Sequence, residues 1–525
     1  MLGAASLVLM SGLTLTAAPA PPPVEIVNQL NAAMQEHWKA AGVTPVGPAD
    51  DAVFLRRVWI DLAGVTPPVA DVQPFVADKD PNKRIKLIDK ILDSDEFADH
   101  WAAVWAQQLL GGRRPIKEER YDGRVLRQYL RDAIKNGVSY KTVVTELITG
   151  EGTSDASGPA TFLLRYEAKP TDLVGAVFKN FQGVSLQCAQ CHDHPFTQWK
   201  KDDFWGTAAY FGRLRLVESG DGDDYIAAIV ESRRGDLKVP DPTAKPKEDG
   251  TQPMKAVRPR LPGGSVASTA GARRTVLAAW ITADDNPYFA TRAVNDAWTR
   301  LLGAGLMPPV DGVDRGATNE WNDAVNLLAT DFKASKYDLK RMVRTIVCSR
   351  AYQLSSGGAA PAETVDLQLR SFARYRARPL SVDQLYASVV RATGYKGDPP
   401  PDPNAAAQPQ GDAAASDDPP MDDPSDRPVE VLTERSQTVQ RALALLNGDY
   451  IHQAVQAGVQ AQLKGADRKP TAADVERLFL ATMARRPTKD EAKAMQELLR
   501  GGDGAAGLED VLWAILNSAE FNTNH

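Results

Sequence analysis

Excess positive charge and the short signatures of the common hydrolases are both missing from this sequence. The 525 residues carry 61 Lys and Arg against 67 Asp and Glu, so the formal net charge is −6. This modest value excludes a general nucleic-acid binder and a polybasic membrane binder. No GxSxG elbow, HExxH motif or P-loop occurs. The acidic groups Asp284 with Asp285, and Asp221 with Asp223 and Asp224, are typical of solvated loops, so a hydrolase has little support.

A hydrophobic run long enough to span a membrane is also missing. Residues 1–23 contain an uncharged apolar run from Leu7 to Leu15, which is too short for a spanning helix and ends in small residues before Pro19. We interpret residues 1–23 as a secretory signal peptide that lacks the usual basic start, which predicts export to the periplasm or cell surface. The alternatives are a retained N-terminal anchor and a true start that lies upstream.

Cysteine is scarce, with three residues in the whole chain. Two of them, Cys188 and Cys191, are followed by His192 in the string Cys-Ala-Gln-Cys-His. Two thiols at this spacing reach both vinyl groups of one porphyrin, and the next imidazole meets the iron from one face. The string therefore predicts haem c, with Cys188 and Cys191 forming thioethers and His192 as the proximal iron ligand. The third cysteine, Cys348, lies in an apolar helical stretch that is typical of a buried, inert thiol.

The second axial ligand of such a haem has to come from another part of the chain. Met307, which follows Gly305 in a predicted loop, is the candidate that we select, and His37, His100 and His452 are the alternatives. A ligand at this position would complete an electron carrier, whereas an open sixth position would favour small-ligand or peroxide chemistry.

Three residues next to the motif are expected to support it. Asp193, His194 and Trp199 follow His192 closely in the sequence. His194 lies too near His192 to reach the opposite face of a porphyrin, so we expect it to hydrogen-bond locally or to cap the following turn. Trp199 and the aromatic residues between 204 and 211 are expected to wall a haem crevice.

Two other chemistries fit the same residues. Cys188, Cys191, His192 and His194 offer the ligands of a Cys2His2 zinc site, although adjacent side chains such as Cys191 and His192 rarely converge on one tetrahedral metal. A disulfide between Cys188 and Cys191 forms readily in an exported protein but adds little stability, because it closes a short loop. Haem is therefore the first hypothesis, and zinc is the alternative cofactor.

Helical periodicity and turn signals predict a mainly α, multi-domain protein. Residues 24–213 form a helical domain that contains the CxxCH string. Residues 214–264 form a small strand-and-loop connector, because their apolar runs are short and separated by Gly, Asp and Pro. A second helical domain covers 265–396 and 429–525. Between its two parts, residues 397–428 form a disordered acidic linker rich in Pro, Asp and Ala, with too little apolar bulk to order itself.

Four strings of the sequence together resemble one protein family. They are Phe54–Pro68 (FLRRVWIDLAGVTPP), Cys188–Trp199 (CAQCHDHPFTQW), Asp285–Gly305 (DNPYFATRAVNDAWTRLLGAG) and Asn517–His525 (NSAEFNTNH). Their order and content resemble planctomycete-type secreted proteins built from two linked domains of unknown function. The resemblance implies a cytochrome-like first domain with a CxxCHDH string, an exported location and a role in electron transfer. It implies no particular substrate.

One position departs from the pattern of that family. Where the family usually has Asn, Arg, any residue and Trp, this chain has Asn295, Asp296, Ala297 and Trp298. A function that the family's arginine serves is therefore in doubt here. The apolar face that continues from Trp298 to Leu301 favours a structural role for this helix.

These observations lead to two hypotheses. The first is an exported c-type haem protein that carries single electrons to or from a redox partner, with partner recognition by the second helical domain. The alternative is a secreted binding or scaffold protein without haem, in which the CxxCHDH string is a disulfide or zinc staple. Its helical surfaces would then bind a secreted protein partner or an extracellular polysaccharide.

Overall fold

The computed structural model describes residues 24–110, 123–195, 197–220, 225–241, 243–264, 272–308, 320–397, 448–463, 469–501 and 505–525. The leader expected over residues 1–23 and the expected acidic linker from residue 398 onward lie outside these residues. Within them, the prediction of a mainly helical protein is confirmed. No helix in this described part is long and apolar enough to cross a membrane.

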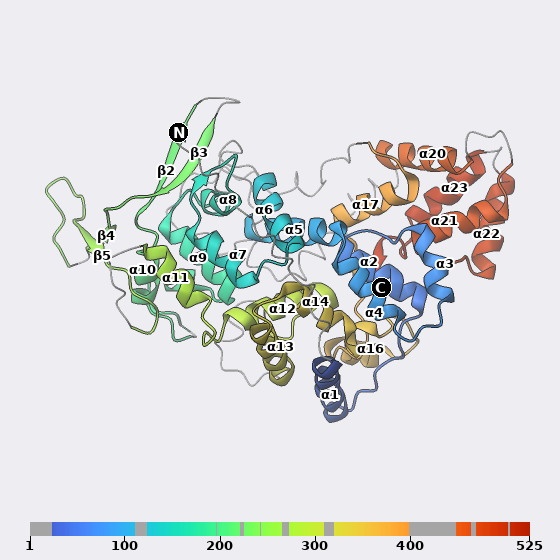
Figure 1. Cartoon of the computed structure of the whole chain (residues 1–525), viewed down its shortest axis with the longest axis horizontal. Helices are drawn as coiled ribbons and strands as arrows, with labels where there is room; N and C mark the ends of the chain where they lie inside the picture. The colour runs from blue at the N-terminus through green and yellow to red at the C-terminus, as the bar shows by residue number, and fades with distance from the viewer. Residues whose placement is uncertain are drawn as a thin grey trace, which may run out of the picture.

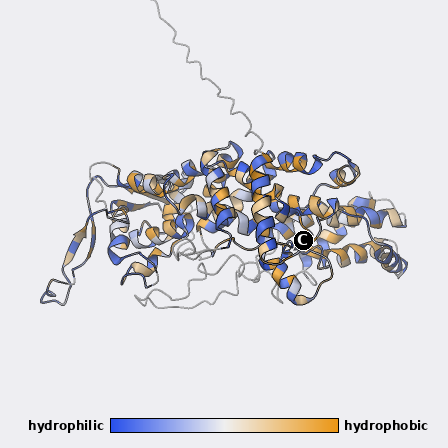
Figure 2. Cartoon of the chain, turned by 90° about the horizontal axis from the view of Figure 1, so that it is seen from below, coloured by the Kyte–Doolittle hydropathy of each residue, from blue (hydrophilic) through white to orange (hydrophobic). Residues whose placement is uncertain are grey.

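The chain folds into an elongated helical body (Figure 1). Polar and apolar residues alternate around its helices (Figure 2), which is typical of helices with one buried face. The helices of the first half are α1 (Val24–Ala40), α2 (Asp51–Ala63), α3 (Val69–Ala77), α4 (Lys83–Leu92), α5 (Asp95–Leu110), α6 (Gly123–Lys135), α7 (Tyr140–Thr149), α8 (Gly158–Leu164), α9 (Pro170–Gln182), the 3-10 helix η2 (Leu186–Ala189) and α10 (Lys201–Ala208).

Helix α2 shows how the local sequence sets the end of a helix. Its last residue is followed by Gly64, which adopts a left-handed conformation with φ 71° and donates its N–H to the carbonyl of Ile60. A Cβ atom on this glycine would lie 2.4 Å from Nδ1 of His100 in α5. Glycine therefore satisfies both the positive φ and the close approach of the neighbouring helix.

Two small antiparallel sheets follow, where the sequence predicts the strand-and-loop element. β1 (Gly152–Thr153), β3 (Ile226–Glu231) and β2 (Leu214–Ser219) form one sheet in the order β1-β3-β2. β4 (Leu237–Pro240) pairs with β5 (Met254–Val257) in the other. The β2–β3 and β4–β5 ribbons lie at one end of the body (Figure 1). The predicted strand-and-loop element is therefore confirmed.

The second half of the chain returns to helices. In Figure 1, α20 to α23 lie at the end of the body opposite the β-ribbons. The elements of this half are α11 (Arg273–Ile281), α12 (Phe289–Leu302), α13 (Asn322–Ala334), α14 (Leu339–Cys348), α15 (Arg350–Gln353), α16 (Ala362–Arg370), β6 (Arg378–Pro379), α17 (Val382–Thr393), α20 (Asp449–Leu463), α21 (Ala472–Met483), α22 (Lys489–Gly501), α23 (Ala505–Leu516) and β7 (Thr523–Asn524).

Buried apolar residues form two clusters that each combine both halves of the chain. The larger cluster joins residues of the first half, such as Trp101, to Leu277, Trp298 and Tyr375 of the second half. The smaller cluster joins α17, α20, α21 and α23 to Ile60 of α2. The larger core is therefore shared by the two halves, whereas the smaller core belongs to the second half except for Ile60.

The C-terminal end of the chain is held against α2 by two buried arginines. Arg56 donates to the carbonyl oxygens of Thr523 at 2.7 Å and Phe521 at 2.8 Å. Arg57 donates to the carbonyl oxygen of His525 at 3.1 Å. These charged donors satisfy backbone acceptors at the end of the chain. The first and the last of the four family-like strings therefore meet in space.

Asp61 lies one helical turn further along α2 and accepts hydrogen bonds from four donors. Its Oδ2 accepts from the hydroxyl groups of Tyr352 at 2.8 Å and Tyr375 at 3.0 Å. Its Oδ1 accepts from Nη2 of Arg378 at 2.6 Å and from Nδ2 of Asn524 at 2.8 Å. Burial raises the pKa of the carboxyl, and the charge of Arg378 acts against that shift. These five residues, the Asp61 cluster, join α2 to the sheet in which β6 pairs with β7.

Candidate functional site

The CxxCH segment, residues 188–192, lies in a short connection between two helices of the first half. Helix α9 is followed by Gly183, which adopts a left-handed conformation with φ 66° and ends the helix. The 3-10 helix η2 then carries Cys188, and α10 begins at Lys201. The motif is therefore presented by a loop whose two ends are fixed by helices.

Both thiols of the segment reach the surface. Cys188 and Cys191 are exposed free cysteines, and Sγ of Cys188 lies 3.2 Å from the hydroxyl oxygen of Ser185. The vinyl groups of a porphyrin can reach thiols only if they are accessible, so this exposure suits thioether formation. Cys348 is partly buried, and burial raises the pKa of its thiol to about 11. It is therefore a poor nucleophile, as the sequence predicts.

The ring of His192 is oriented by a backbone carbonyl. Its Nδ1 lies 2.7 Å from the carbonyl oxygen of Asp193. Because a carbonyl oxygen only accepts, Nδ1 is the donor of this hydrogen bond, and in the neutral ring Nε2 is then the nitrogen that can bind a metal. A hydrogen bond of this kind is typical of histidines that bind a metal through the other ring nitrogen. The donor set of two exposed thiols and this imidazole fits haem c.

Asp193 also fixes the segment to the next helix. Its Oδ1 accepts a hydrogen bond from the backbone N–H of Lys201, the first residue of α10, at 2.9 Å. The carbonyl of Asp193 thus orients His192, while the carboxylate binds the helix start. The sequence places Asp193 among the supporting residues, and its contacts are consistent with that role.

His194 and Trp199 lie in the interior rather than at the surface, with exposed fractions of 9% and 4%. The backbone N–H of His194 donates to the carbonyl oxygen of Trp199 at 2.8 Å. The Trp199 ring packs edge-on against Phe178, with centroids 5.7 Å apart, and lies 5.8 Å from the ring of Tyr288. These contacts anchor the end of the loop in the core.

The aromatic residues of α10 and the turn after it pack mainly in the interior of the protein. Phe204 and Phe211 are fully buried. Trp205 is partly exposed and donates its indole N–H to the carbonyl oxygen of Gln190 at 3.0 Å. Burying these large rings in the core stabilises the fold more than leaving them around a cavity. Trp205 therefore supports the segment, and the expected haem crevice stays a prediction.

Met307, the first candidate for the distal ligand, lies just beyond the end of α12. Its backbone N–H donates to Oδ1 of Asn295 at 2.9 Å, and its carbonyl oxygen accepts from Nδ2 of Asn295 at 2.9 Å. Asn295 therefore has the structural role expected of this helix, and Trp298 beside it is fully buried. These contacts do not involve the CxxCH segment, so the ligand role of Met307 stays a prediction.

The three alternative histidines lie on three different helices. His37 of α1 packs its ring against Trp321, with centroids 3.7 Å apart, and burial lowers its pKa. Burial also lowers the pKa of His100 in α5 to about 4, and the nearby Arg300 contributes to that shift. His452 is exposed on α20. Their roles as distal ligands stay predictions.

The residues named for the zinc alternative do not gather around one point. In the described ranges, no group of three or more His, Cys, Asp and Glu side chains is arranged to hold a metal ion. Cys188, Cys191 and His192 are exposed, whereas His194 is buried. A tetrahedral site needs four converging ligands, so this donor set fits haem attachment better than zinc.

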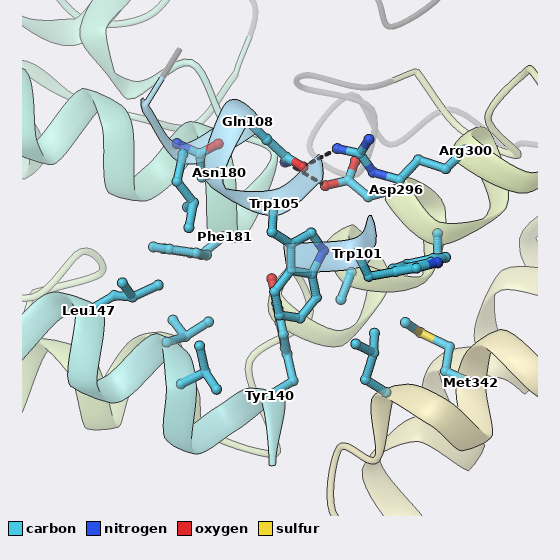
Figure 3. A pocket seen from close by; sticks show the side chains of 16 residues that line it. Trp101, Trp105, Gln108, Tyr140, Leu147, Asn180, Phe181, Asp296, Arg300 and Met342 are labelled. Atoms are coloured by element: carbon cyan, nitrogen blue, oxygen red, sulfur yellow. Dashed lines mark hydrogen bonds between the residues drawn. The ribbon is translucent and has the colours of Figure 1, made fainter. Parts of the chain in front are cut away.

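A pocket lies between helices of the two halves. It is lined by residues of α5, α7, α9, α12 and α14. The space between these walls is about 530 Å³ when open solvent is included, and the cavity itself is about 30 Å³. Its walls combine four aromatic rings with aliphatic side chains (Figure 3). Trp105 lies edge-on to Tyr140 with ring centroids 5.3 Å apart, and Trp101 and Phe181 complete the aromatic lining. Mostly apolar pockets with a few polar groups are typical small-molecule sites.

Gln108, Asp296 and Arg300 form a polar wall on one side of this pocket (Figure 3). Gln108 donates to Oδ2 of Asp296 at 3.2 Å and accepts from Nη2 of Arg300 at 2.5 Å. Asp296 also pairs with Arg292 at 3.0 Å. Asp296, the residue that departs from the family pattern, therefore lines the pocket. The sequence analysis did not predict this pocket. The available signal was the placement of Arg292, Asp296 and Arg300 four residues apart, on one helix face.

Fold and motif together define a mainly helical protein in which a region with a CxxCH motif precedes a second helical region. The family model PSCyt2, described as a protein of unknown function (DUF1549), matches residues 29–215. The model PSD1, described as a protein of unknown function (DUF1553), matches residues 273–499. The chain therefore belongs to the proteins that join a PSCyt2 domain to a PSD1 domain, in that order, which confirms the resemblance seen in the sequence. The first domain is named as cytochrome-like and its function is otherwise unknown. No curated protein and no solved structure gives a match.

Proposed function

We propose that this protein is an exported c-type haem protein that transfers single electrons. The observation that carries the proposal is the geometry of the CxxCH segment. Cys188 and Cys191 expose free thiols, and His192 keeps Nε2 available because its Nδ1 donates to the carbonyl oxygen of Asp193. The name of the matching first domain, which marks it as cytochrome-like, supports the same chemistry.

In this proposal the chain's own residues perform three tasks. The thiols of Cys188 and Cys191 would each add across one vinyl group, with sulfur bonding to one carbon and the proton passing to the other, so the step would need no oxidant. Nε2 of His192 would bind the iron. The carbonyl of Asp193 holds the ring of His192 in the orientation that this bond requires. A bound haem would supply one-electron exchange between ferrous and ferric iron.

The position of the segment also bears on the partner. Because Cys188, Cys191 and His192 are all exposed, a porphyrin attached there would lie near the surface and within reach of a redox partner. In this proposal the PSD1 region supplies partner recognition, since one haem needs far less protein than the whole chain provides. The apolar leader at residues 1–23 supports export, because it has the length of a signal peptide.

The test is an optical spectrum of the full chain purified from a host that attaches c-type haem, followed by a pyridine haemochrome assay. The expected result is a c-type spectrum that disappears in the Cys188→Ala, Cys191→Ala double variant. The matched control is Cys348→Ala, which removes the partly buried thiol of α14 and should leave the spectrum unchanged.

A colourless protein with the helical content of the native fold would overturn the haem proposal. The same preparation then tests the alternative of a secreted binding or scaffold protein. Titration of free thiols would distinguish a Cys188–Cys191 disulfide from two reduced cysteines, and elemental analysis would detect bound zinc.

A further inference from the structure

The pocket between the two halves lies outside the machinery that electron transfer requires. Helices α5, α7 and α9 of its lining fall within the match to the first family domain, and α12 and α14 fall within the match to the second. The cysteines and the histidine of the CxxCH segment do not line it. Ligand sites occur preferentially where two domains meet, because both can contribute groups to a cavity that neither closes alone.

The polar wall of the pocket holds one positive and one negative side chain, Arg300 and Asp296. Arg292, which does not line the pocket, adds a second positive charge next to Asp296. Asp296 is already engaged by Arg292 at 3.0 Å and by the amide of Gln108 at 3.2 Å. Arg300 donates to the neutral oxygen of Gln108. The positive charge of Arg300 is therefore the one that an anionic ligand could neutralise.

The opposite walls favour the flat face of a ring. Trp105 and Tyr140 present two aromatic surfaces at 60° to each other, and Phe181 adds a third (Figure 3). Such surfaces bind planar rings by stacking and bind the C–H face of a sugar ring by apolar contact. A ligand held at the polar wall would rest its ring on these side chains.

We propose that this pocket binds a small molecule in which one six-membered ring carries a carboxylate. The carboxylate pairs with Arg300, and the ring lies against Trp105 and Tyr140. A guanidinium binds a carboxylate through two parallel N–H donors, which fixes the ligand's orientation as well as its charge. Aromatic acids and uronic sugars share this chemistry, and the experiment distinguishes them.

The experiment is calorimetric titration of the full chain with benzoate and with D-glucuronate. The neutral counterparts benzyl alcohol and D-glucose are titrated under the same conditions. We expect saturable binding of at least one acid and binding at least about tenfold weaker for its neutral counterpart. Binding of benzoate alone identifies aromatic acids, and binding of D-glucuronate alone identifies uronic sugars. No saturable binding of either acid, or equal binding of acid and neutral counterpart, would overturn the proposal.

Two variants locate the site. Arg300→Gln should lower the affinity for the acid at least about tenfold and leave the affinity for the neutral compound unchanged. The matched control is Arg370→Gln, which removes an exposed arginine paired with Asp366 on α16 and should change nothing. Trp105→Leu keeps the polar wall and should lower the affinity for the same acid. If Arg300→Gln fails to fold, Trp105→Leu and the comparison of acid with neutral compound decide the question. Unchanged acid affinity in a folded Arg300→Gln or Trp105→Leu variant would place the binding elsewhere.

Discussion

Replacing Asp61 with asparagine removes one buried negative charge from the fold and keeps nearly the same side-chain shape. The pair it disrupts is well covered by protein, because the side chains of Arg378 and Asp61 are 12% and 5% exposed. We expect Asp61→Asn to destabilise the protein even though it lies far along the chain from the CxxCH segment. The reason is that Arg378 would stay buried without its counter-ion.

The magnitude follows from the four donors around the carboxylate. An asparagine can still accept from Arg378 and Asn524 through its oxygen, and its amide can donate to the tyrosine hydroxyl groups, which can rotate to accept. The loss is then mainly electrostatic, and we expect about 3 kcal/mol, the lower end for breaking a buried ion pair. Asp61→Ala removes all four acceptor contacts and should cost about 5 kcal/mol.

Urea unfolding followed by tryptophan fluorescence measures this loss. The matched control is Asp71→Asn, which breaks a pair with the exposed Lys90 and should cost at most about 1 kcal/mol. A double-mutant cycle with Arg378→Met isolates the interaction between Asp61 and Arg378. The loss of unfolding free energy in the double variant should be smaller than the sum of the losses in the two single variants. If Asp61→Asn lies within about 0.5 kcal/mol of the native protein, or if the two variants are additive, the Asp61 cluster does not act as a buried charge pair.

Three further predictions concern other parts of the molecule. His192→Ala should retain covalent haem, because both thioethers remain, but it should shift the Soret band and the reduction potential; unchanged values would contradict His192 as the axial ligand. Burial lowers the pKa of His100 to about 4 from its ordinary 6.5, so stability should fall as pH drops from 6.5 towards 4, and His100→Gln should flatten the unfolding midpoint across that range. A slope left unchanged by His100→Gln would assign the effect to other groups. Gly64→Ala should cost about 1–3 kcal/mol in urea unfolding, because φ is 71° and the added Cβ would lie 2.4 Å from the His100 ring; a stability close to the native value would show that α2 and α5 can separate freely.

Features set by neighbouring residues were accessible from the sequence. The spacing within Cys188 to His192 is enough to predict the attachment chemistry, because all three groups act on one porphyrin. Alternation of short apolar runs with Gly, Asp and Pro was likewise enough for the β-ribbons. In both cases the signal and the structure that it specifies lie within a few tens of residues.

Features that combine distant segments could not be predicted in the same way. The pocket brings Trp105, Tyr140, Phe181 and Arg300 together from four helices, and periodicity says which face of each helix is buried but not which faces meet. For the same reason, the sequence does not decide how the aromatic residues after the motif are used. A ring that packs under a loop and a ring that walls a cavity give the same apolar pattern.

The shared core explains why the cytochrome-like region cannot be understood apart from the rest of the chain. Arg57 is buried, and it donates to the carbonyl oxygens of Tyr352, Leu354 and His525, all outside the match to the first domain. Without those acceptors a guanidinium would remain in the interior with its donors unpaired, which costs several kcal/mol. Ile60, on the same helix, would lose the apolar cluster of α17 to α23 that covers it. Helix α2, in the first family-like string, is thus completed by residues of the last one. A protein cut between the two domains would expose the charge of Arg57 and the apolar side chain of Ile60.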